Sequence, residues 1–363
     1  MRRFWIALAL TVVVPAVGPA LLDAQEPERP SFSAWLDGVR AEALARGITQ
    51  DIVDAALGDI PAPLPVVIER DRAQAEVVET FERYISRRVT TRNTTTGRTE
   101  LARHRALLSR VSEKYGVPAP LIVGIWGIES NYGKFTGVRP TIAALATLAW
   151  DPRRATFFRG ELFSALEILN RGDIELAKMR GSWAGAMGQL QFMPSSYLKY
   201  AEDYDDDGRR DIWGSHDDIF ASIGNYLKGY GWKEGQRWGR EVKVATEAAR
   251  KISSDVARRD GSCNAKRDMT VPLPVARWTE LGVTLPSGAP LPEDDNDSAL
   301  VAGSTRYFLV NGNYDALLDY NCAHAYALTV GLLGDAIAAP PPKPKPAAVR
   351  TPAPKPAAKP SQR

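Results

Sequence analysis

The chain has 363 residues, of which 44% are hydrophobic and 25% charged, a composition typical of a globular protein with one large core or two smaller ones. Its 46 Lys and Arg residues and 43 Asp and Glu residues give a formal net charge of +3, and part of the basic excess lies in the C-terminal tail. A nucleic-acid partner is therefore not expected. Many of the 9 Trp and 12 Tyr residues stand beside Gly and polar residues, which weakly favours a carbohydrate groove.

The N-terminus predicts export. Arg2 and Arg3 precede an apolar run over residues 4–22, and Ala24 offers a small side chain for cleavage. We interpret residues 1–24 as a signal peptide of a periplasmic protein, with an uncleaved inner-membrane anchor as the alternative. Because no Cys stands near the cleavage point, a lipoprotein anchor is excluded. In an oxidising compartment Cys263 and Cys322 are expected to form a disulfide rather than two separate buried thiols.

The first two thirds of the chain are predicted to be helical. Apolar residues recur three and four apart from residue 32 onward, so residues 25–110 are interpreted as a helical scaffold domain. After a helical stretch that ends near Tyr115, Pro118 opens a helix that is apolar on every side over residues 121–128. A helix of this kind is buried, so it should cross the middle of a core domain over residues 111–235. Further helices are predicted within this domain at residues 141–150, 161–169 and 195–200.

The remaining third has a weaker pattern. Residues 236–297 are interpreted as a small strand-containing or irregular insertion, because the apolar stretch at Met269 leads into a segment rich in Pro and Gly. Helices are expected to resume at Ser298 and to continue to residue 338. Residues 339–363 consist largely of Pro, Ala and Lys, which cannot bury surface, and are predicted to be a disordered tail. The predicted class is mainly α, with a small β-containing part.

Glu129 is the first candidate for chemistry, since residues 124–133 read Gly-Ile-Trp-Gly-Ile-Glu-Ser-Asn-Tyr-Gly and place one carboxylate at the end of the all-apolar helix. Burial favours the neutral form of a carboxylate and raises its pKa, which keeps a proton available for a leaving oxygen. Glycosidases use such an acid. The alternative is a Glu that only closes the helix by accepting hydrogen bonds from loop donors.

A second candidate segment covers residues 181–197 and is rich in small residues. Gly and Ala allow close approach of a backbone or a sugar ring, and the side chains of Ser182 and Gln191 could bind the polar edge of that ring. Tight helix packing is the alternative explanation of this segment.

A third candidate is an acidic loop that opens like an EF-hand. Asp203, Asp205 and Asp207 would supply carboxylates to Ca²⁺ and Arg209 its carbonyl oxygen. Without a cation the acids from residue 203 to 207 would repel one another. The twelfth position holds Gly214 instead of Glu, so a longer loop closed by Asp217 or Asp218 is required. A solvated acidic turn is the alternative.

Together these segments closely resemble the lytic murein transglycosylase B family, glycoside hydrolase family 103, over roughly residues 32–337. The resemblance implies a lysozyme-like catalytic core with a flanking helical domain, a small β-containing insertion and a structural Ca²⁺ loop for which Asp218 is the favoured closing ligand. It implies no organic cofactor. Glu129 matches the family's catalytic residue. The matching groove positions are Ser182, Met187, Gln191, Tyr226, Tyr320, Asn321 and Tyr326.

The resemblance also implies a reaction and partners. The expected enzyme cleaves the β-1,4 bond between N-acetylmuramic acid and N-acetylglucosamine in peptidoglycan and leaves 1,6-anhydromuramoyl ends. Peptidoglycan glycan strands are the expected partner of a monomer, with other cell-wall enzymes as further candidates. The alternatives are a hydrolytic muramidase of similar fold, which would leave reducing ends, and a non-catalytic peptidoglycan-binding protein.

Overall fold

The computed structural model describes residues 30–73, 79–294 and 296–340. The expected signal peptide lies outside the described residues, and so does the tail from residue 341 onward. In the described part of the chain, no helix combines the length and the apolar character that a membrane crossing needs. Helices dominate this part, in agreement with the predicted class.

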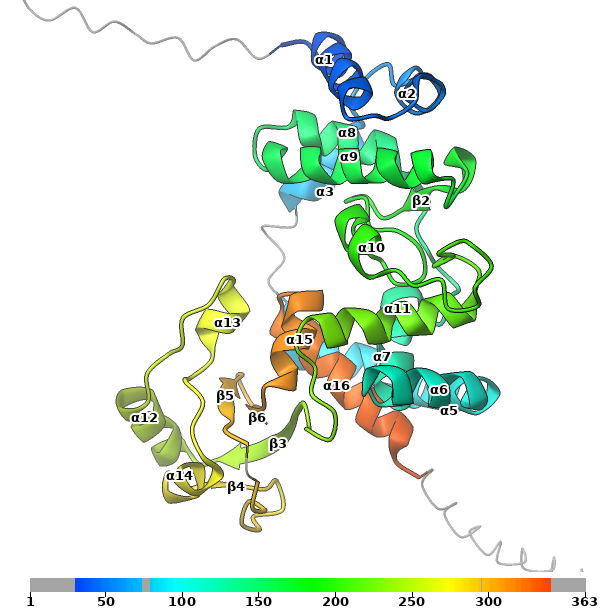
Figure 1. Cartoon of the computed structure of the whole chain (residues 1–363). Helices are drawn as coiled ribbons and strands as arrows, with labels where there is room; N and C mark the ends of the chain where they lie inside the picture. The colour runs from blue at the N-terminus through cyan, green and yellow to red at the C-terminus, as the bar shows by residue number, and fades with distance from the viewer. Residues whose placement is uncertain (1–29, 74–78, 295, 341–363) are drawn as a thin grey trace, which may run out of the picture.

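One body of the molecule is a helical layer drawn at the top of Figure 1. Its first three helices pack against two helices from much later in the sequence, and the latter two pack against each other. Thr147 shows how closely the two segments fit, because its hydroxyl accepts a hydrogen bond from the backbone amide of Leu64. The helices of this layer are α1 (Phe32–Ala45), α2 (Gln50–Leu57), α3 (Pro65–Ala73), α8 (Thr141–Trp150) and α9 (Ala155–Arg171).

The second body surrounds α7, the helix predicted to be apolar on every side. Residues 121–128 are all buried, and α5, α6, α11 and α16 pack against the helix. Gly124 and Gly334 stand at the crossing of α7 and α16, where a methyl group on either would press against backbone of the other helix. The helices of this body are α4 (Phe81–Arg88), α5 (Thr91–Arg103), α6 (Arg105–Tyr115), α7 (Ala119–Ser130), α10 (Pro194–Tyr200), α11 (His216–Gly229), α15 (Asn313–Tyr320) and α16 (His324–Ala338).

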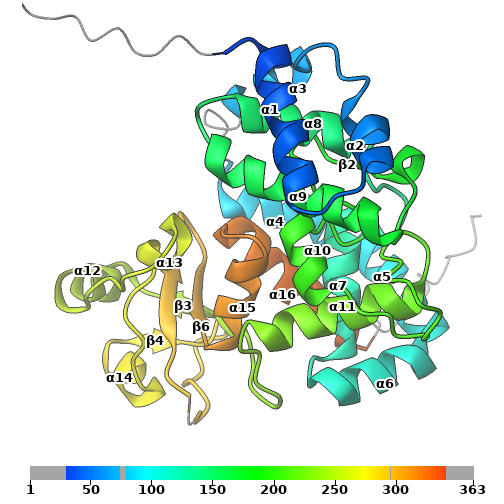
Figure 2. The same cartoon turned by 45° about the horizontal axis from the view of Figure 1, so that its top comes forward.

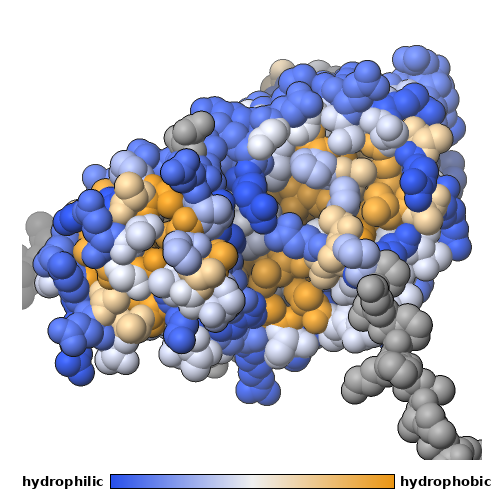
Figure 3. All heavy atoms as spheres, turned by 90° about the horizontal axis from the view of Figure 1, so that it is seen from below, coloured by the Kyte–Doolittle hydropathy of each residue, from blue (hydrophilic) through white to orange (hydrophobic). Residues whose placement is uncertain are grey.

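The third body is built on an antiparallel sheet with the strand order β4-β3-β6-β5. It has its own hydrophobic core, in which Trp278 is fully buried beside Val242 and Leu309. Seen from below, patches of apolar residues on this body and on the rest of the molecule are separated by hydrophilic residues (Figure 3). Its elements are β3 (Gly239–Val244), α12 (Thr246–Asp255), α13 (Asn264–Asp268), α14 (Val275–Glu280), β4 (Val283–Thr284), β5 (Ala299–Ala302) and β6 (Tyr307–Val310).

Two predicted boundaries were wrong. Residues 299–310 were expected to be helical, but they form β5 and β6, which pair with each other, and β6 also pairs with β3. Each is a four-residue apolar run, separated from the other by Gly303, Ser304, Thr305 and Arg306, and its length is consistent with a buried strand. The predicted scaffold of residues 25–110 is divided as well, because α1 to α3 join α8 and α9, whereas α4 and α5 pack on α16 and α7.

Candidate active site

Glu129 is the penultimate residue of α7 and lies at the point where this buried helix ends. The helix stops because Asn131 and Tyr132 both adopt positive φ angles, 52° and 59°. Glu129 keeps a partly exposed side, in contrast to residues 121–128. Packing around its carboxylate raises the pKa of Glu129 to about 7, while the Tyr326 hydroxyl and the Arg88 guanidinium each act to lower it. The group can therefore carry or release a proton near neutral pH.

Two tyrosines from the C-terminal helices stand beside this carboxylate. The rings of Tyr320 on α15 and Tyr326 on α16 are stacked, with centroids 5.9 Å apart. Burial, followed by the charge of Glu129, raises the pKa of both phenols well above the usual range. The Tyr320 hydroxyl donates to the carbonyl oxygen of Leu190. The buried Tyr326 hydroxyl acts on the Glu129 carboxyl group, but among the described residues it has no hydrogen-bond partner of ordinary geometry.

Helix α4 brings two residues to Glu129 that sequence analysis did not identify. Burial raises the pKa of Tyr84, and this phenol interacts electrostatically with both Arg88 and Glu129. The Arg88 guanidinium lies over the Tyr84 ring, 5.5 Å from its centroid. Tyr84 and Arg88 are one helical turn apart, a spacing that shows they share a helix face but does not show what that face meets.

The segment rich in small residues forms a folded loop beside the end of α7. Ser182 organises its start, because the Ser182 hydroxyl accepts hydrogen bonds from the backbone amides of Ala184 and Ala186. Gln191 has a φ of 51°, and its amide donates to the carbonyls of Thr136 and Gly188. Both Ser182 and Gln191 are half-buried at the rim of this loop.

Met187 differs from the other predicted groove residues. Its backbone exchanges hydrogen bonds with Phe192 across the loop, and its side chain has no exposed surface. The apolar side chain fills the core beneath the loop instead of lining a groove. Met187 is therefore not part of the surface open to a ligand in this structure, contrary to our prediction.

Tyr226 and Asn321, the remaining predicted groove residues, differ in burial. Tyr226 on α11 packs its ring 4.6 Å from that of Tyr320 and donates its hydroxyl to the carbonyl of Asp319. It is buried, so it supports Tyr320. Asn321 is exposed at the end of α15, with extended backbone at φ −149°.

Gln189 connects three parts of the site, a role that its position in the sequence did not reveal. Its carbonyl oxygen accepts from the indole N–H of Trp126 at 2.7 Å, and its amide donates to the carbonyl of Trp213 at 2.7 Å. Trp126 lies on α7 and Trp213 in the acidic loop. Gly133 must be glycine here because it has a φ of 76° and a methyl group would meet the Gln189 side chain.

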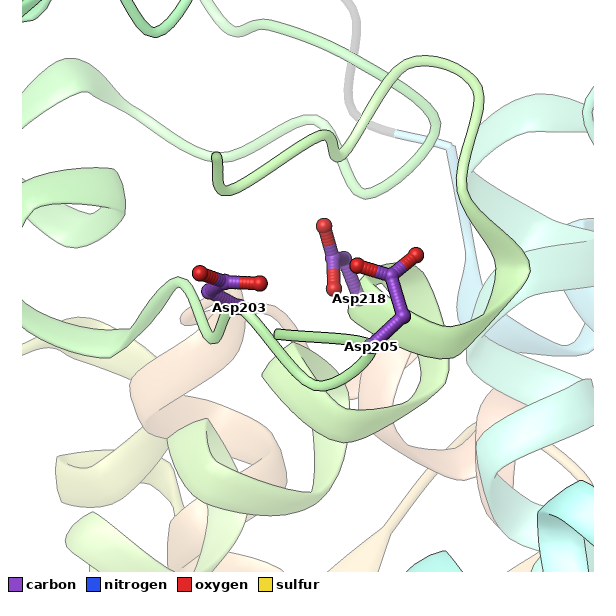
Figure 4. Close-up of side chains that lie close together, drawn as sticks. All are labelled: Asp203, Asp205 and Asp218. Carbon is purple, nitrogen blue, oxygen red and sulfur yellow. The ribbon is translucent and has the colours of Figure 1, made fainter. Parts of the chain in front are cut away.

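The acidic loop gathers three of the predicted metal ligands. Oxygen atoms of Asp203, Asp205 and Asp218 all lie within 4.8 Å of one another, and the three side chains face a common space in Figure 4. Burial raises the pKa of Asp218 to about 6, and the charges of Asp205 and Asp203 add to this effect. The Asp207 carboxylate instead contacts Arg209. Asp217, the alternative closing ligand, lies 3.5 Å from Arg110 and outside the cluster.

The donor set of this cluster fits Ca²⁺. All of its side-chain ligands are hard carboxylate oxygens, which is the preference of this ion. Asp218 is fully buried, and its two oxygens accept backbone N–H bonds from Tyr204 and Asp211 without meeting a cationic side chain among the described residues. The orientation of the Arg209 carbonyl, the remaining predicted ligand, is not fixed by any of these contacts.

Cys263 and Cys322 are joined in a disulfide, with their Cα atoms 6.4 Å apart. Cys263 precedes α13 in the sheet body, and Cys322 follows Asn321 between α15 and α16. Nearby, Lys266 contacts Asp319 at 2.6 Å and Arg259 contacts Asp315 at 3.0 Å. The sheet body is thus attached to the helices that carry Tyr320 and Tyr326.

The site is lysozyme-like: it combines a buried helix that ends in a carboxylate, tyrosines from two later helices and an acidic loop. Comparison with known proteins assigns its family. The model of the transglycosylase SLT domain matches residues 31–335. The chain therefore belongs to this family, of the lytic murein transglycosylase B type.

Individual relatives agree with this assignment. The chain is 40% identical over 156 residues to the membrane-bound lytic murein transglycosylase B of Escherichia coli K12, and the alignment spans 43% of each chain. It is similar to SltB3 from Pseudomonas aeruginosa, solved in complex with NAG-anhNAM-pentapeptide, with 39% identity and a TM-score of 0.76 over 85% of this chain and 80% of that one. It is also similar to Escherichia coli Slt35 in complex with calcium, with 27% identity and a TM-score of 0.68 over 86% of this chain and 93% of that one.

Proposed function

We propose that this protein is a peptidoglycan lytic transglycosylase. It cleaves the β-1,4 bond between N-acetylmuramic acid and N-acetylglucosamine and leaves a 1,6-anhydromuramoyl end. The observation that carries the proposal is Glu129, a half-buried residue at the end of a buried helix whose carboxyl group has a pKa of about 7 because of burial. A general acid is most effective when its pKa is close to the working pH.

The first step of the proposed reaction is proton donation. Protonated Glu129 gives its proton to the glycosidic oxygen, and the bond from that oxygen to C1 of the muramoyl residue breaks. The oxygen leaves as the 4-hydroxyl of N-acetylglucosamine. The carbonyl oxygen of the substrate's own 2-acetamido group stabilises the positive charge that develops at C1.

The second step returns the proton to Glu129. Its carboxylate removes the proton of the muramoyl 6-hydroxyl, whose oxygen forms the new bond to C1, so water is not consumed. Glycosidases that use water normally employ a second carboxylate. The side chains that shift the pKa of Glu129 are Tyr326 and Arg88. Among the described residues, no second Asp or Glu contributes to this shift. This supports a reaction with a single carboxylate.

We propose the substrate contacts from the polar atoms and the exposed surface of each side chain. The Tyr326 hydroxyl stands beside the Glu129 carboxyl group and has no partner of ordinary geometry among the described residues, and Asn321 has an exposed side chain. Ser182 and Gln191 are half-buried on the loop that faces the end of α7, where they would hold the acetamido group and the ring. The half-buried Tyr320 supplies an aromatic face, the buried Tyr226 packs against it, and Met187 supports the loop from below.

We also propose that Asp203, Asp205 and Asp218 hold a structural Ca²⁺, with Asp207 and the Arg209 carbonyl as further ligands of the expected loop. When bound, the ion would neutralise the mutual repulsion of these carboxylates. It would stabilise the loop and, through the Gln189 contact with Trp213, the neighbourhood of α7. The proton transfers are assigned to Glu129 alone.

Export to the periplasm is the proposed localisation, because Arg2, Arg3 and the apolar run at residues 4–22 have the form of a signal peptide. Peptidoglycan strands are the proposed partner, and other cell-wall enzymes remain candidates. Cell fractionation of the full chain, with and without residues 2–24, tests the export.

The reaction is tested by mass analysis of the muropeptides released from purified sacculi. We expect anhydromuramoyl ends from the wild type and a decrease of about 10²- to 10⁴-fold in their release by Glu129→Gln. Reducing ends would identify a hydrolytic muramidase instead. No release by either protein would identify a non-catalytic binding protein.

A further inference from the structure

The guanidinium of Arg88 differs from the other arginines of α4. Arg83 and Arg87 both contact Glu79, at 3.6 Å and 2.5 Å. Arg88 is half-buried, and in the part of the chain that the structure describes its guanidinium contacts the Tyr84 ring but no carboxylate. Its charge acts on Glu129, but among the described residues the two groups form no ion pair. A partly desolvated charge that lacks an ion pair is costly to keep, so a binding partner from outside the chain would relieve that cost.

The position of Arg88 is fixed relative to Glu129 by a chain of hydrogen bonds. The Arg88 carbonyl accepts from the side-chain amide of Asn93 at 2.7 Å, and the Asn93 carbonyl accepts from the Tyr132 hydroxyl at 2.7 Å. Tyr132 stands three residues after Glu129. Helix α4 also packs against α16, which carries Tyr326; Figure 2 labels both helices. The backbone at Arg88 is thus fixed relative to the end of α7, and the guanidinium is near enough to act on the pKa of Glu129.

From this geometry, and resting on the proposed function, we propose that Arg88 binds a carboxylate of the muramoyl substrate and makes the enzyme selective for anionic strands. Guanidinium binds carboxylate through two parallel hydrogen bonds, which Lys cannot reproduce. Muramic acid offers this group in one of two forms. Its lactyl substituent is a free carboxylate in stem-free strands, and in stem-bearing strands the lactyl group is an amide while the peptide carries carboxylates of its own.

Binding at Arg88 would also act on proton transfer. In the free enzyme the guanidinium acts to lower the pKa of Glu129. A bound carboxylate cancels that positive charge, so the pKa of Glu129 rises and the acid keeps its proton to a higher pH in the complex. Anionic substrate would therefore promote the protonated form that the first step requires.

The test compares three substrates: stem-bearing strands, strands stripped by an amidase, and stripped strands whose lactyl carboxyls are converted to neutral amides. We expect Arg88→Gln to lower kcat/KM about 10- to 100-fold on a carboxylate-bearing substrate. The loss of kcat/KM on the neutral strands should be smaller than this by a factor of about ten or more. If the loss is larger on the stem-bearing strands, Arg88 binds a peptide carboxylate. If it is larger on the stripped strands, Arg88 binds the lactyl carboxylate. Arg88→Lys keeps the charge but cannot form the two parallel hydrogen bonds, so its kcat/KM should lie between those of the wild type and Arg88→Gln.

Arg87→Gln is the matched control, since Arg87 is the neighbouring arginine of α4 and is occupied by Glu79. It should leave all three rates near the wild-type value. In Arg88→Gln the upper limb of the kcat/KM profile should move to higher pH, because the positive charge beside Glu129 is gone. A loss that is equal on all three substrates, or one that Arg87→Gln shares, overturns the inference. Absence of anhydro products from the wild type would instead overturn the proposed function.

Discussion

At the scale of single residues, Glu129 makes the protein less stable in the pH range where it would work. Its pKa is about 7 in the folded protein, against an ordinary value of 4.5. The folded state therefore binds this proton more tightly than the unfolded state does. The stabilisation linked to that proton is complete below about pH 4.5 and is lost as the pH rises through about 7.

We predict that Glu129→Gln stabilises the protein at about pH 8 and has little effect at about pH 4. Gln is neutral at both values, so it avoids the cost of burying the ionised carboxylate. The displaced pKa corresponds to up to about 3 kcal/mol, less if water reaches the open side of the site. Denaturant unfolding of both proteins across this pH range measures the difference.

The exposed Glu175, which contacts Lys178 at the surface, supplies the control. Glu175→Gln should show no stabilisation that grows with pH. If Glu129→Gln is no more stable than the wild type at about pH 8, the carboxylate is not buried as the structure describes.

The residues around Glu129 differ in how far the sequence could reveal them. Glu129 could be identified because a single carboxylate ends an otherwise apolar helix. Tyr84 and Arg88 were missed, since their local pattern is that of an ordinary polar helix face. Their meeting with Glu129 depends on the packing of α4 against α16, helices more than 200 residues apart. Met187 was assigned to the groove by resemblance, and the structure buries it.

At the scale of elements, the acidic loop depends on its junction with α11. Asp218 lies in the first turn of this helix and accepts backbone amides from both ends of the loop, Tyr204 and Asp211. The loop is therefore closed by hydrogen bonds as well as by any ion. The neighbouring Asp217 faces Arg110 instead, and this difference between adjacent residues allows a matched test.

We predict that Ca²⁺ raises the melting temperature of the wild type and of Asp217→Asn, but raises that of Asp205→Asn much less. Asp205 supplies a carboxylate to the cluster, whereas Asp217 does not. Asp218→Asn is a poorer probe because it also weakens two backbone contacts. Thermal unfolding in chelator and in Ca²⁺ measures the effect, and equal shifts in all three proteins would contradict the assignment.

The predicted elements were most accurate where the apolar segment was long. The expected helix at residues 141–150 matches α8, and the fully apolar helix is α7. Strands β5 and β6 were missed because four apolar residues are too few to distinguish a strand from a piece of buried helix. The identity of β6 is decided by pairing with β3, whose partner residues lie 65 to 71 positions earlier in the chain, and β5 in turn pairs with β6.

At the scale of the whole molecule, the attachment of the sheet body controls the helices that complete the site. The sheet body has its own core, and its contacts with α15 include ion pairs of Lys266 and Arg259. The disulfide between Cys263 and Cys322 closes a loop over a sequence separation of 59 residues. Chain entropy assigns up to about 4 kcal/mol of stability to a link of this length.

We predict that replacing both cysteines by Ser lowers stability by about 2–4 kcal/mol and weakens substrate binding. Asn321 directly precedes Cys322, and Tyr320 precedes it by two residues, so loosening this junction should raise KM more than it lowers kcat. Unfolding and sacculus turnover with and without reductant measure both effects. Reductant should reproduce the loss in the wild type and leave the double Ser variant unchanged. A wild type whose stability and KM do not respond to reductant would show that the ion pairs alone hold the sheet body in place.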